Sequence, residues 1–490
     1  MPDVPRNEHK NEESGGLDRR SVLKYGGVGA MTAGLAGCQS PENPIDAANF
    51  RNPENDPGEP PGTDNGEDLE GPLAGQTLDI GVLAPMELPL GESMWNAARM
   101  AAEQLNDAGG ILGATVDVHL GDTEVSPGTA ESEHQRLIVQ EGVDITVGIF
   151  LGSALLQTMP SIANQEKIHL TTASADPRIG QLVSQSDPFG DTDEETGYEQ
   201  FKYHFRVGPL HLLDLADAML EFVENNRDEL GWDRAALLTE NLGEFDPYAE
   251  RLQEQLETVI DVPVEQRPGG VSNWRPIFDE IESEDCDIAV IGMALGGTTA
   301  VNQWAQQERE FEFGGIHVPS QAYDYWESTG GNVEFVWTMN AMTPQTENTP
   351  RTQEFVEDYM QQWESVPIYT GPLTFDGINL FAQALEETVE EEGLEEIPDS
   401  DTLIPYLEEI TFTDGTVLEE FQFTPPDAAF AHEPQFTSVE ETGVPVFQQW
   451  QMDEENDPDY GTMHSFAPEQ NQTAPYLRPD WMGGDDVDTN

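Results

Sequence analysis

The chain of 490 residues carries 95 Asp and Glu against 20 Lys and Arg, a formal net charge of −75. A chain of this length exceeds one compact core, so we expect two lobes with appendages. Nucleic acid is excluded as a partner, because acidic residues occur in every segment and no basic patch is available. A calcium-buffering protein is disfavoured, since no D-x-D-x-D-G loop with a Glu at its twelfth position occurs.

The acidic excess has a physical consequence. A surface this negative repels itself in dilute buffer and needs high ionic strength to screen its charge. Lysine is scarce as well, with only four residues: Lys10, Lys24, Lys167 and Lys202. The composition resembles that of extremely halophilic archaea, so we expect a halophilic protein.

Residues 1–37 have the features of an export signal. Arg19 and Arg20 precede an apolar run that is too short to span a bilayer as a stable helix. The pair resembles the twin-arginine signal, and the alternative is a chance pair before a buried helix. The sequence LAGC that ends at Cys38 resembles a lipobox, in which the cysteine is lipidated. We therefore expect a protein anchored at Cys38 on the extracellular face of the cell membrane.

Two segments lack the large apolar residues that a core needs. Residues 38–75 are dense in Pro, Gly, Asn, Asp and Glu and are predicted to form a disordered acidic tether. Residues 479–490 are expected to form an acidic tail. The other cysteine, Cys286, lies in an apolar run, and with Cys38 lipidated we expect it to be a buried thiol without a disulfide.

The stretch from residue 144 to residue 177 organises the rest of the chain. An apolar run over 144–150 predicts a strand, 154–165 a helix and 168–172 a second strand. The two strands should lie parallel, and the turns that follow them should open at the same sheet edge. That edge is where open α/β sheets bind ligands.

The first of these turns, residues 151–153, places Ser153 as the N-cap of the helix. Free backbone N–H groups and a hydroxyl at a helix N-terminus suit a carboxylate ligand. A residue that only caps the helix is an equally good interpretation of Ser153.

Strand and helix signals alternate along the body, which is typical of the α/β class. The pattern restarts after an acidic loop at 187–199, so a second α/β lobe is expected. Expected strands are 77–83, 116–120, 235–239, 288–292, 421–423 and 446–452. Expected helices are 94–106, 129–141, 212–225, 247–258, 274–283, 298–309, 352–364 and 369–389.

The sequence LDIGVLAPMELPLGESMWNAARMAAEQLNDAGGILG resembles the opening of the type I periplasmic-binding-protein fold, in the branched-chain amino-acid (Leu/Ile/Val) receptor family of ABC transporters. The segments VGIFLGS, TTASADP, TFDGINLFAQAL and VFQQWQ resemble later parts of that family in the same order. The resemblance spans nearly the whole body. It implies two Rossmann-like lobes joined by a three-crossing hinge, which close on a ligand.

The resemblance also implies domain limits. Lobe 1 comprises 76–207 and 341–430, and lobe 2 comprises 208–340 and 431–478. The three crossings fall near 206–209, 338–343 and 425–436, where the backbone absorbs the rotation of closure.

Seven site residues follow from the resemblance. Ser153, with the N–H groups around Gly152, matches the group that holds the ligand α-carboxylate. Ala173 and Ala175 match a turn whose backbone carbonyl takes the ammonium, and Ser174 is a substitute for a hydroxyl that the family often has at position 175. Phe245 matches an aromatic wall, with a core phenylalanine as the alternative. Gln321 falls where amino-acid receptors place a carboxylate for the ammonium group.

That glutamine leaves the ligand class open, because a neutral amide pairs weakly with a cation. The expected ligand is a branched-chain or other amino acid, with short amides or urea as alternatives. The protein is expected to be a monomeric substrate-binding lipoprotein that delivers this solute to an ABC permease and its ATPase subunits. A ligand-sensing receptor of the same fold is the rival reading. No G-x-S-x-G, H-E-x-x-H or P-loop motif occurs, so no enzyme activity, cofactor or metal is expected.

Overall fold

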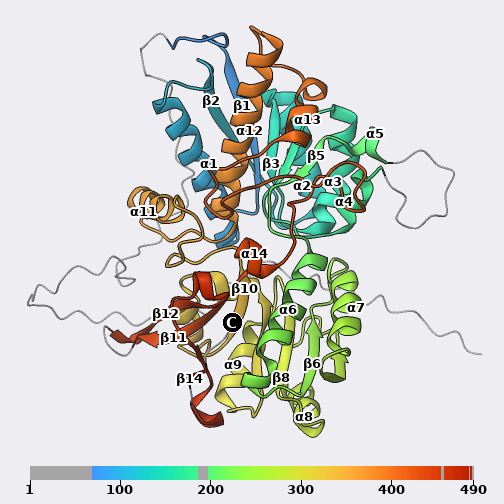
Figure 1. The fold of residues 1–490 in the computed structure, drawn as a ribbon, viewed down its shortest axis with the longest axis vertical. Coiled ribbons are helices and arrows are strands. Elements are labelled where there is room, and N and C mark those ends of the chain that lie inside the picture. The colour runs from blue at the N-terminus through green and yellow to red at the C-terminus, as the bar shows by residue number, and fades with distance from the viewer. Residues whose placement is uncertain (1–68, 186–196, 454–456, 485, 488–490) are drawn as a thin grey trace, which may run out of the picture. The chain divides into compact units, whose positions relative to one another are not determined.

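The computed structural model of the chain describes residues 69–185, 197–453, 457–484 and 486–487. The expected export signal with Arg19 and Arg20, the expected lipidation site Cys38, and the expected tether up to residue 68 lie outside the described residues. Within them, two sheets with helices packed around each form two lobes (Figure 1).

The sheet of lobe 1 consists of parallel strands in the order β2-β1-β3-β4-β5. Its inner strands β3 and β4 are buried throughout, as expected where helices cover both faces of a parallel sheet. The strands are β1 (Thr77–Ala84), β2 (Thr115–Asp122), β3 (Ile145–Gly148), β4 (His169–Thr171) and β5 (His204–Arg206). The helices are α1 (Pro89–Asp107), α2 (Pro127–Arg136), α3 (Gly152–Gln165), α4 (Arg178–Val183), α5 (Tyr198–Phe201), α11 (Thr352–Trp363), α12 (Thr370–Glu392) and α13 (Ser400–Glu409).

The sheet of lobe 2 has the order β12-β11-β10-β9-β8-β6-β7, in which β11 and β12 run antiparallel to their neighbours. Its strands are β6 (Arg234–Thr239), β7 (Asp261–Gln266), β8 (Ile288–Met293), β9 (Glu312–His317), β10 (Trp337–Asn340), β11 (Val446–Asp453) and β12 (Asp457–Ala467). Its helices are α6 (Leu212–Leu230), α7 (Phe245–Leu256), α8 (Arg275–Ser283), α9 (Thr298–Gln306), α10 (Tyr325–Thr329) and α14 (Val439–Thr442). A short ribbon of β13 (Tyr476–Leu477) and β14 (Asp486–Val487) follows.

The chain passes between the lobes three times. It leaves lobe 1 between β5 and α6 and returns between β10 and α11. The third passage follows Pro434, which still bridges to Phe423 in lobe 1. Beyond it, the Val439 and Glu440 N–H groups of α14 donate to the Glu221 carboxylate of α6 at 2.9 and 3.1 Å.

The prediction for the stretch 144–177 is confirmed: β3 and β4 pair in parallel and both lead into turns at one edge. The N-cap assignment is wrong. Helix α3 begins at Gly152 with Leu151 as N-cap, and no side chain caps it. Ser153 therefore lies within the first turn, where its side chain is exposed.

Other differences concern element limits. Helix α1 begins at Pro89 rather than residue 94, because proline suits the first helical position, where the N–H has no partner. Residues 421–423 form isolated bridges with Phe412 and Pro434 instead of a strand. Strands β5, β7, β9, β10 and β12 and helix α13 had no counterpart among the expected elements, and neither did the short elements α4, α5, α10, α14, β13 and β14.

The folded part begins before residue 76 and continues beyond residue 478. Leu73 is fully buried, and its N–H donates to the Leu112 carbonyl at 3.1 Å. At the other end, the Trp481 indole donates to the Arg309 carbonyl at 2.8 Å and packs edge-on against Trp304. Apolar side chains thus tie both flanking segments to the lobes.

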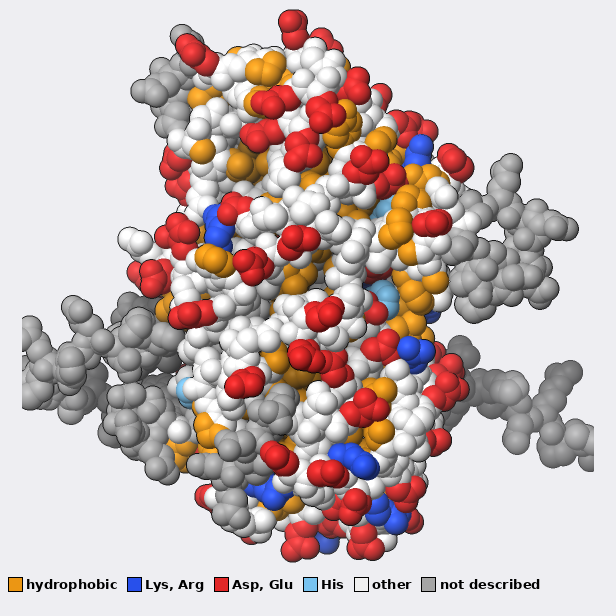
Figure 2. All heavy atoms as spheres, in the orientation of Figure 1, with side chains coloured by type: hydrophobic (Ala, Val, Ile, Leu, Met, Phe, Trp, Pro, Cys, Tyr) orange, Lys and Arg blue, Asp and Glu red, His pale blue; other side chains and the backbone are white. Residues whose placement is uncertain are grey.

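Acidic side chains are scattered over both lobes on the face seen in Figure 2, and basic ones are few there. Each helix within the described ranges is too short or too polar to traverse a lipid bilayer. Cys286 is a buried free thiol, as expected.

Candidate functional site

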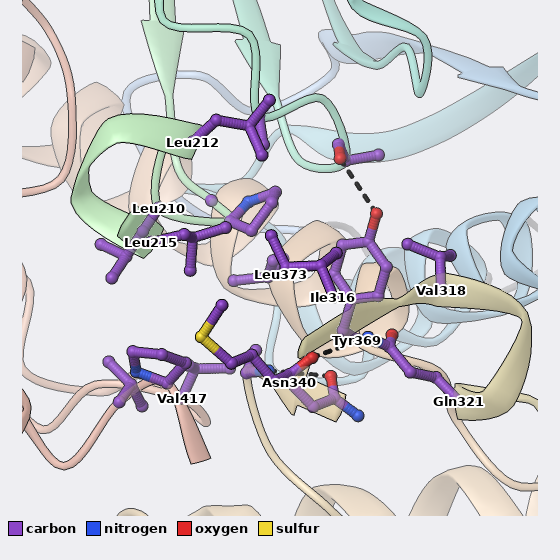
Figure 3. Close-up of a pocket in the computed structure, with 18 of the residues that line it drawn as sticks. Leu210, Leu212, Leu215, Ile316, Val318, Gln321, Asn340, Tyr369, Leu373 and Val417 are labelled. Atoms are coloured by element: carbon purple, nitrogen blue, oxygen red, sulfur yellow. Dashed lines mark hydrogen bonds between the residues drawn. The ribbon is translucent and has the colours of Figure 1, made fainter. Parts of the chain in front are cut away.

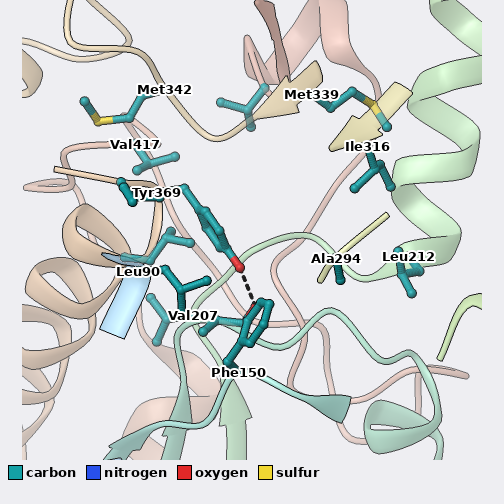
Figure 4. Packing of buried hydrophobic residues seen from close by; sticks show 14 of the residues in the cluster. Leu90, Phe150, Val207, Leu212, Ala294, Ile316, Met339, Met342, Tyr369 and Val417 are labelled. Carbon is teal, nitrogen blue, oxygen red and sulfur yellow. Dashed lines mark hydrogen bonds between the residues drawn. The ribbon is translucent and has the colours of Figure 1, made fainter. Parts of the chain in front are cut away.

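A pocket of about 100 Å³ lies where the two lobes and the three crossings meet (Figure 3). Most of its walls are apolar side chains (Figure 4). The parallel strands explain this convergence, because their carboxyl ends point toward the gap between the sheets. Lining residues that follow or end these strands are Phe150, Ala173, Val207, Ala294, Ile316 and Met339.

The structure brings four of the seven expected site residues to this pocket: Ala173, Ala175, Phe245 and Gln321. Gly152, Ser153 and Ser174 are not among the residues that line it. Ser174 is buried, and its hydroxyl accepts from the Asp176 N–H at 3.4 Å.

The N-terminus of α3 already has an anionic partner. The Gly152 N–H donates to Oε2 of Glu244, a lobe 2 side chain, at 2.7 Å. A Cβ at Gly152 would lie 2.5 Å from that oxygen and 2.6 Å from Oδ2 of Asp176. Two carboxylates therefore converge on the position where the sequence predicted a ligand carboxylate, and only glycine leaves room for them.

The turn after β4 is also engaged by groups of the protein. The Tyr369 hydroxyl donates to the Ala173 carbonyl at 3.0 Å (Figure 4). The Leu212 N–H, at the start of α6, donates to the Ala175 carbonyl at 2.8 Å. The backbone carbonyls expected to take an ammonium group thus have protein donors in this structure.

Arg206, the last residue of β5, holds the same turn in place through hydrogen bonds. Its guanidinium donates to the Asp176 carbonyl at 2.7 Å and also to the Ser174 carbonyl, and it pairs with Glu433. Arg206 and Glu433 are both almost fully buried. The end of β5, the turn after β4 and the segment before the third crossing are consequently fixed to one another.

Phe245 and Gln321 combine lining and packing roles. Phe245 is 2% exposed and packs edge-on against Tyr248, with ring centroids 5.9 Å apart, so it is both a wall and a core residue. Gln321 is 5% exposed, and its Nε2 donates to the Met339 carbonyl at 2.9 Å. Its Oε1 has no hydrogen-bond partner within the described part of the chain.

The charge in the pocket comes from Glu244. Burial, together with the like charge of Asp176, raises the pKa of this carboxyl to about 7, although the Gly152 N–H and Arg178 act in the opposite direction. Burial also raises the pKa of Tyr369, so its hydroxyl stays protonated as a donor. No cluster of potential metal ligands occurs among the residues that the structure describes.

Three residues that shape the site had not been predicted from sequence: Glu244, Arg206 and Tyr369. Glu244 had no signal, because one more acid is invisible in a chain so rich in acids. Arg206 had one, since it stands between the apolar residues Phe205 and Val207 in a chain with few basic residues.

Curated and structurally determined proteins resemble this chain. The chain is 28% identical over 111 residues to the Leu/Ile/Val-binding protein BraC3 of Rhizobium johnstonii, an alignment that covers 22% of this chain and 30% of that protein. The chain thus spans less than a third of the length of the curated relatives it matches.

Two solved structures share the fold over most of the chain. One is the LivJ substrate-binding protein of a branched-chain amino acid transporter from Streptococcus pneumoniae in complex with isoleucine. It has 15% identity and a TM-score of 0.61, and the match covers 80% of this chain and all of that one. The other is a solute-binding protein of an ABC transporter from Rhodopseudomonas palustris in complex with 3,4-dihydroxybenzoic acid. It has 16% identity and a TM-score of 0.60, and the match covers 79% and 97% of the two chains.

These likenesses establish the type I periplasmic-binding-protein fold that the sequence predicted, with one sheet in each of two lobes. A family model described as "Periplasmic binding protein" matches residues 77–444, which is most of the chain. The chain therefore belongs to the periplasmic binding protein family.

Proposed function

We propose that this chain is the substrate-binding component of an ABC importer, which captures a small solute between its lobes and delivers it to a permease and its ATPase subunits. One observation carries this proposal: a small, mostly apolar pocket is bounded by both lobes and by all three chain passages between them. Pockets of this kind, with few polar groups among apolar walls, are typical ligand sites. The family consists of binding proteins rather than enzymes, in agreement with this role.

The solute is small and carries an apolar part. The free volume of about 100 Å³ is below that of pockets for drug-sized ligands. The relatives' ligands, isoleucine and 3,4-dihydroxybenzoic acid, are small molecules with apolar bodies. An amino acid is one candidate ligand, by likeness to the relatives. A short amide is another, because the side chain of Gln321 is neutral.

The proposal includes the cellular setting expected from the sequence. The chain is exported by the twin-arginine route, lipidated at Cys38 and held as a monomer on the extracellular face of a halophile's cell membrane. The motifs at Arg19, Arg20 and Cys38 and the net charge of −75 support this part.

A pocket-filling variant tests the capture role. Ala294, which is 8% exposed, lines the pocket from the end of β8. In molar KCl, a thermal-shift screen of amino acids, amides, amines and carboxylic acids should raise the melting temperature of the wild type with at least one compound. Ala294→Phe should abolish that shift. Ala108→Phe adds the same bulk at an exposed position after α1 and should preserve it. A shift that survives in Ala294→Phe would place binding elsewhere.

A further inference from the structure

Glu244 is the only charged residue among the described residues that line the pocket. It begins the turn into α7 from lobe 2, directly before the wall residue Phe245. Its carboxylate reaches across to the Gly152 N–H of lobe 1 at 2.7 Å. The lobes are thus joined at the pocket edge by an acid and a helix N-terminus that belong to the same chain.

This contact uses the position that a ligand anion would require. The first N–H groups of a helix attract negative charge, and here Glu244 supplies that charge. Asp176 lies beside it, with its Oδ2 2.6 Å from where a Cβ on Gly152 would be. Asp176 is paired with Arg178, whereas Glu244 takes the Gly152 N–H, so a ligand carboxylate that enters this corner meets the Glu244 carboxylate and finds the donor occupied.

The other polar side chains of the pocket that can donate each make a hydrogen bond within the protein. Asn340 donates from Nδ2 to Gln448 at 2.9 Å, and Gln321 donates from Nε2 to the Met339 carbonyl at 2.9 Å. The Tyr369 hydroxyl donates to the Ala173 carbonyl. Acceptors, by contrast, are available: the Glu244 carboxyl is ionised at pH 8, above its pKa of about 7, and Gln321 Oε1 has no partner in the described part of the chain.

We propose that Glu244 determines the ligand class of this pocket: by occupying the anion position at the N-terminus of α3, it excludes carboxylates and selects a small apolar amine. The ammonium group of such a ligand pairs with Glu244, and its hydrocarbon part contacts the apolar walls. This inference rests on the proposed capture function. It departs from the solved relatives, whose ligands, isoleucine and 3,4-dihydroxybenzoic acid, both carry a carboxyl group.

Ligands that share one isobutyl group but differ in their polar group separate the possibilities. Titration calorimetry in molar KCl at pH 8 compares 3-methylbutylamine, leucine, 4-methylpentanoic acid and 4-methylpentanamide. Wild type should bind the amine at least about tenfold more tightly than leucine or the acid, since a charge-assisted hydrogen bond is worth about that factor. The amide, which donates without a charge, should fall between them.

Variants of the acid assign the effect. Glu244→Gln should bind 3-methylbutylamine at least about tenfold more weakly than wild type does. The difference in affinity between this amine and 4-methylpentanoic acid should be smaller in the variant. Glu250→Gln, an exposed position on the same helix, is the matched control and should behave as wild type. Circular dichroism of each variant verifies that it is folded.

Two outcomes overturn the inference. The first is that wild type binds leucine or 4-methylpentanoic acid more tightly than the amine, which would contradict the inference but leave the capture function intact. Unchanged amine affinity in folded Glu244→Gln would do so as well. Failure of the capture function has a different signature, because then no compound of any class shifts the melting temperature in an Ala294-dependent manner.

Discussion

The two lobes share one architecture but fill their cores differently. In lobe 1, three fully buried histidines lie on neighbouring elements: His134 on α2, His169 on β4 and His204 on β5. Each bonds to a buried hydroxyl, on Ser161, Thr146 and Thr171 respectively, at 2.9–3.0 Å. Lobe 2 instead contains a cluster of aromatic side chains, namely Phe222, Trp232, Trp337, Phe447 and Phe466.

The difference teaches that one fold can depend on two kinds of interaction. Part of lobe 1 is stabilised by buried polar side chains that have hydrogen-bond partners. Protonation of such a buried histidine costs free energy, because it places a charge in the core. The five aromatic side chains of the lobe 2 cluster are not titratable, so their packing does not depend on pH, but it is sensitive to lost volume. The predictions below separate the two.

The largest effect is expected in the aromatic cluster. Trp337 is fully buried, stacks on Trp232 and lies against Gly314, where a Cβ would come within 2.2 Å of its ring. Trp337→Ala should lower the free energy of unfolding of lobe 2 by about 3–5 kcal/mol through lost contact and a cavity. Urea titration in molar salt measures this loss. Trp337→Phe should lose less, and equal losses would show that ring packing is not the cause.

The second effect concerns acid. Burial lowers the pKa of His134 from 6.5 to about 4. The unfolded chain therefore takes up a proton as the pH falls below 6.5, while the folded lobe does not. The neutral histidine's contribution is complete above pH 6.5 and is lost toward pH 4, a change of up to about 3 kcal/mol. His169 and His204 act in the same direction, since burial lowers both pKa values.

Hydrogen exchange of β3 and β4 measured against pH tests this prediction. His134→Gln should show a shallower loss of protection between pH 6.5 and 4 than wild type. Asp376 on α12 acts oppositely, because burial raises its pKa to about 7, so only the difference between variant and wild type is diagnostic. If protection falls equally steeply with pH in His134→Gln and in wild type, His134 does not contribute to the loss of stability in acid.

A third, smaller effect lies between the lobes. Gly152→Ala places a Cβ against the Glu244 and Asp176 carboxylates. This overpacking should lower the free energy of unfolding by about 1–3 kcal/mol. Both cores should stay intact, whereas ligand affinity falls. Calorimetric binding together with urea titration separates these outcomes, and unchanged binding would show that the contact can shift without consequence.

The smallest effect is expected at Ser153. Its side chain is exposed, does not cap α3 and does not line the pocket. Ser153→Ala should change ligand affinity and stability by less than about 0.5 kcal/mol, as at ordinary surface positions. A tenfold loss of affinity would instead restore Ser153 as the carboxylate-binding group that the resemblance implied.

The fold was predictable wherever local pattern and tertiary environment agreed. Strand β1 was found to within one residue, and helix α6 was found from its first residue, although it ends at Leu230 rather than at residue 225. Strand β9 was missed because its sequence EFGGIH contains two glycines, which strands usually avoid. Here Gly314 makes room for Trp337, and Gly315 adopts a φ of +149° against Ile291, requirements set by neighbours far away in the sequence.

The site was predictable in position more than in chemistry. Ala173, Ala175, Phe245 and Gln321 follow strand ends, and a parallel sheet brings such positions together whatever their side chains are. Which groups are free to contact a ligand depends on contacts across the two lobes. No local pattern reveals that Glu244 would occupy the Gly152 N–H or that Tyr369 would occupy the Ala173 carbonyl.

The buried pair of Arg206 and Glu433 has a mechanical consequence. The pair joins the start of the first crossing, at the end of β5, to the segment that leads into the third crossing. These two connecting segments therefore cannot rotate independently on the lobe 1 side. In the first and third crossings, rotation between the lobes is thereby confined to the few residues that precede α6 and α14. A fluorescent reporter built from this chain should carry its two dyes on different lobes and far from that short pivot, where a modest rotation yields the greatest change in separation.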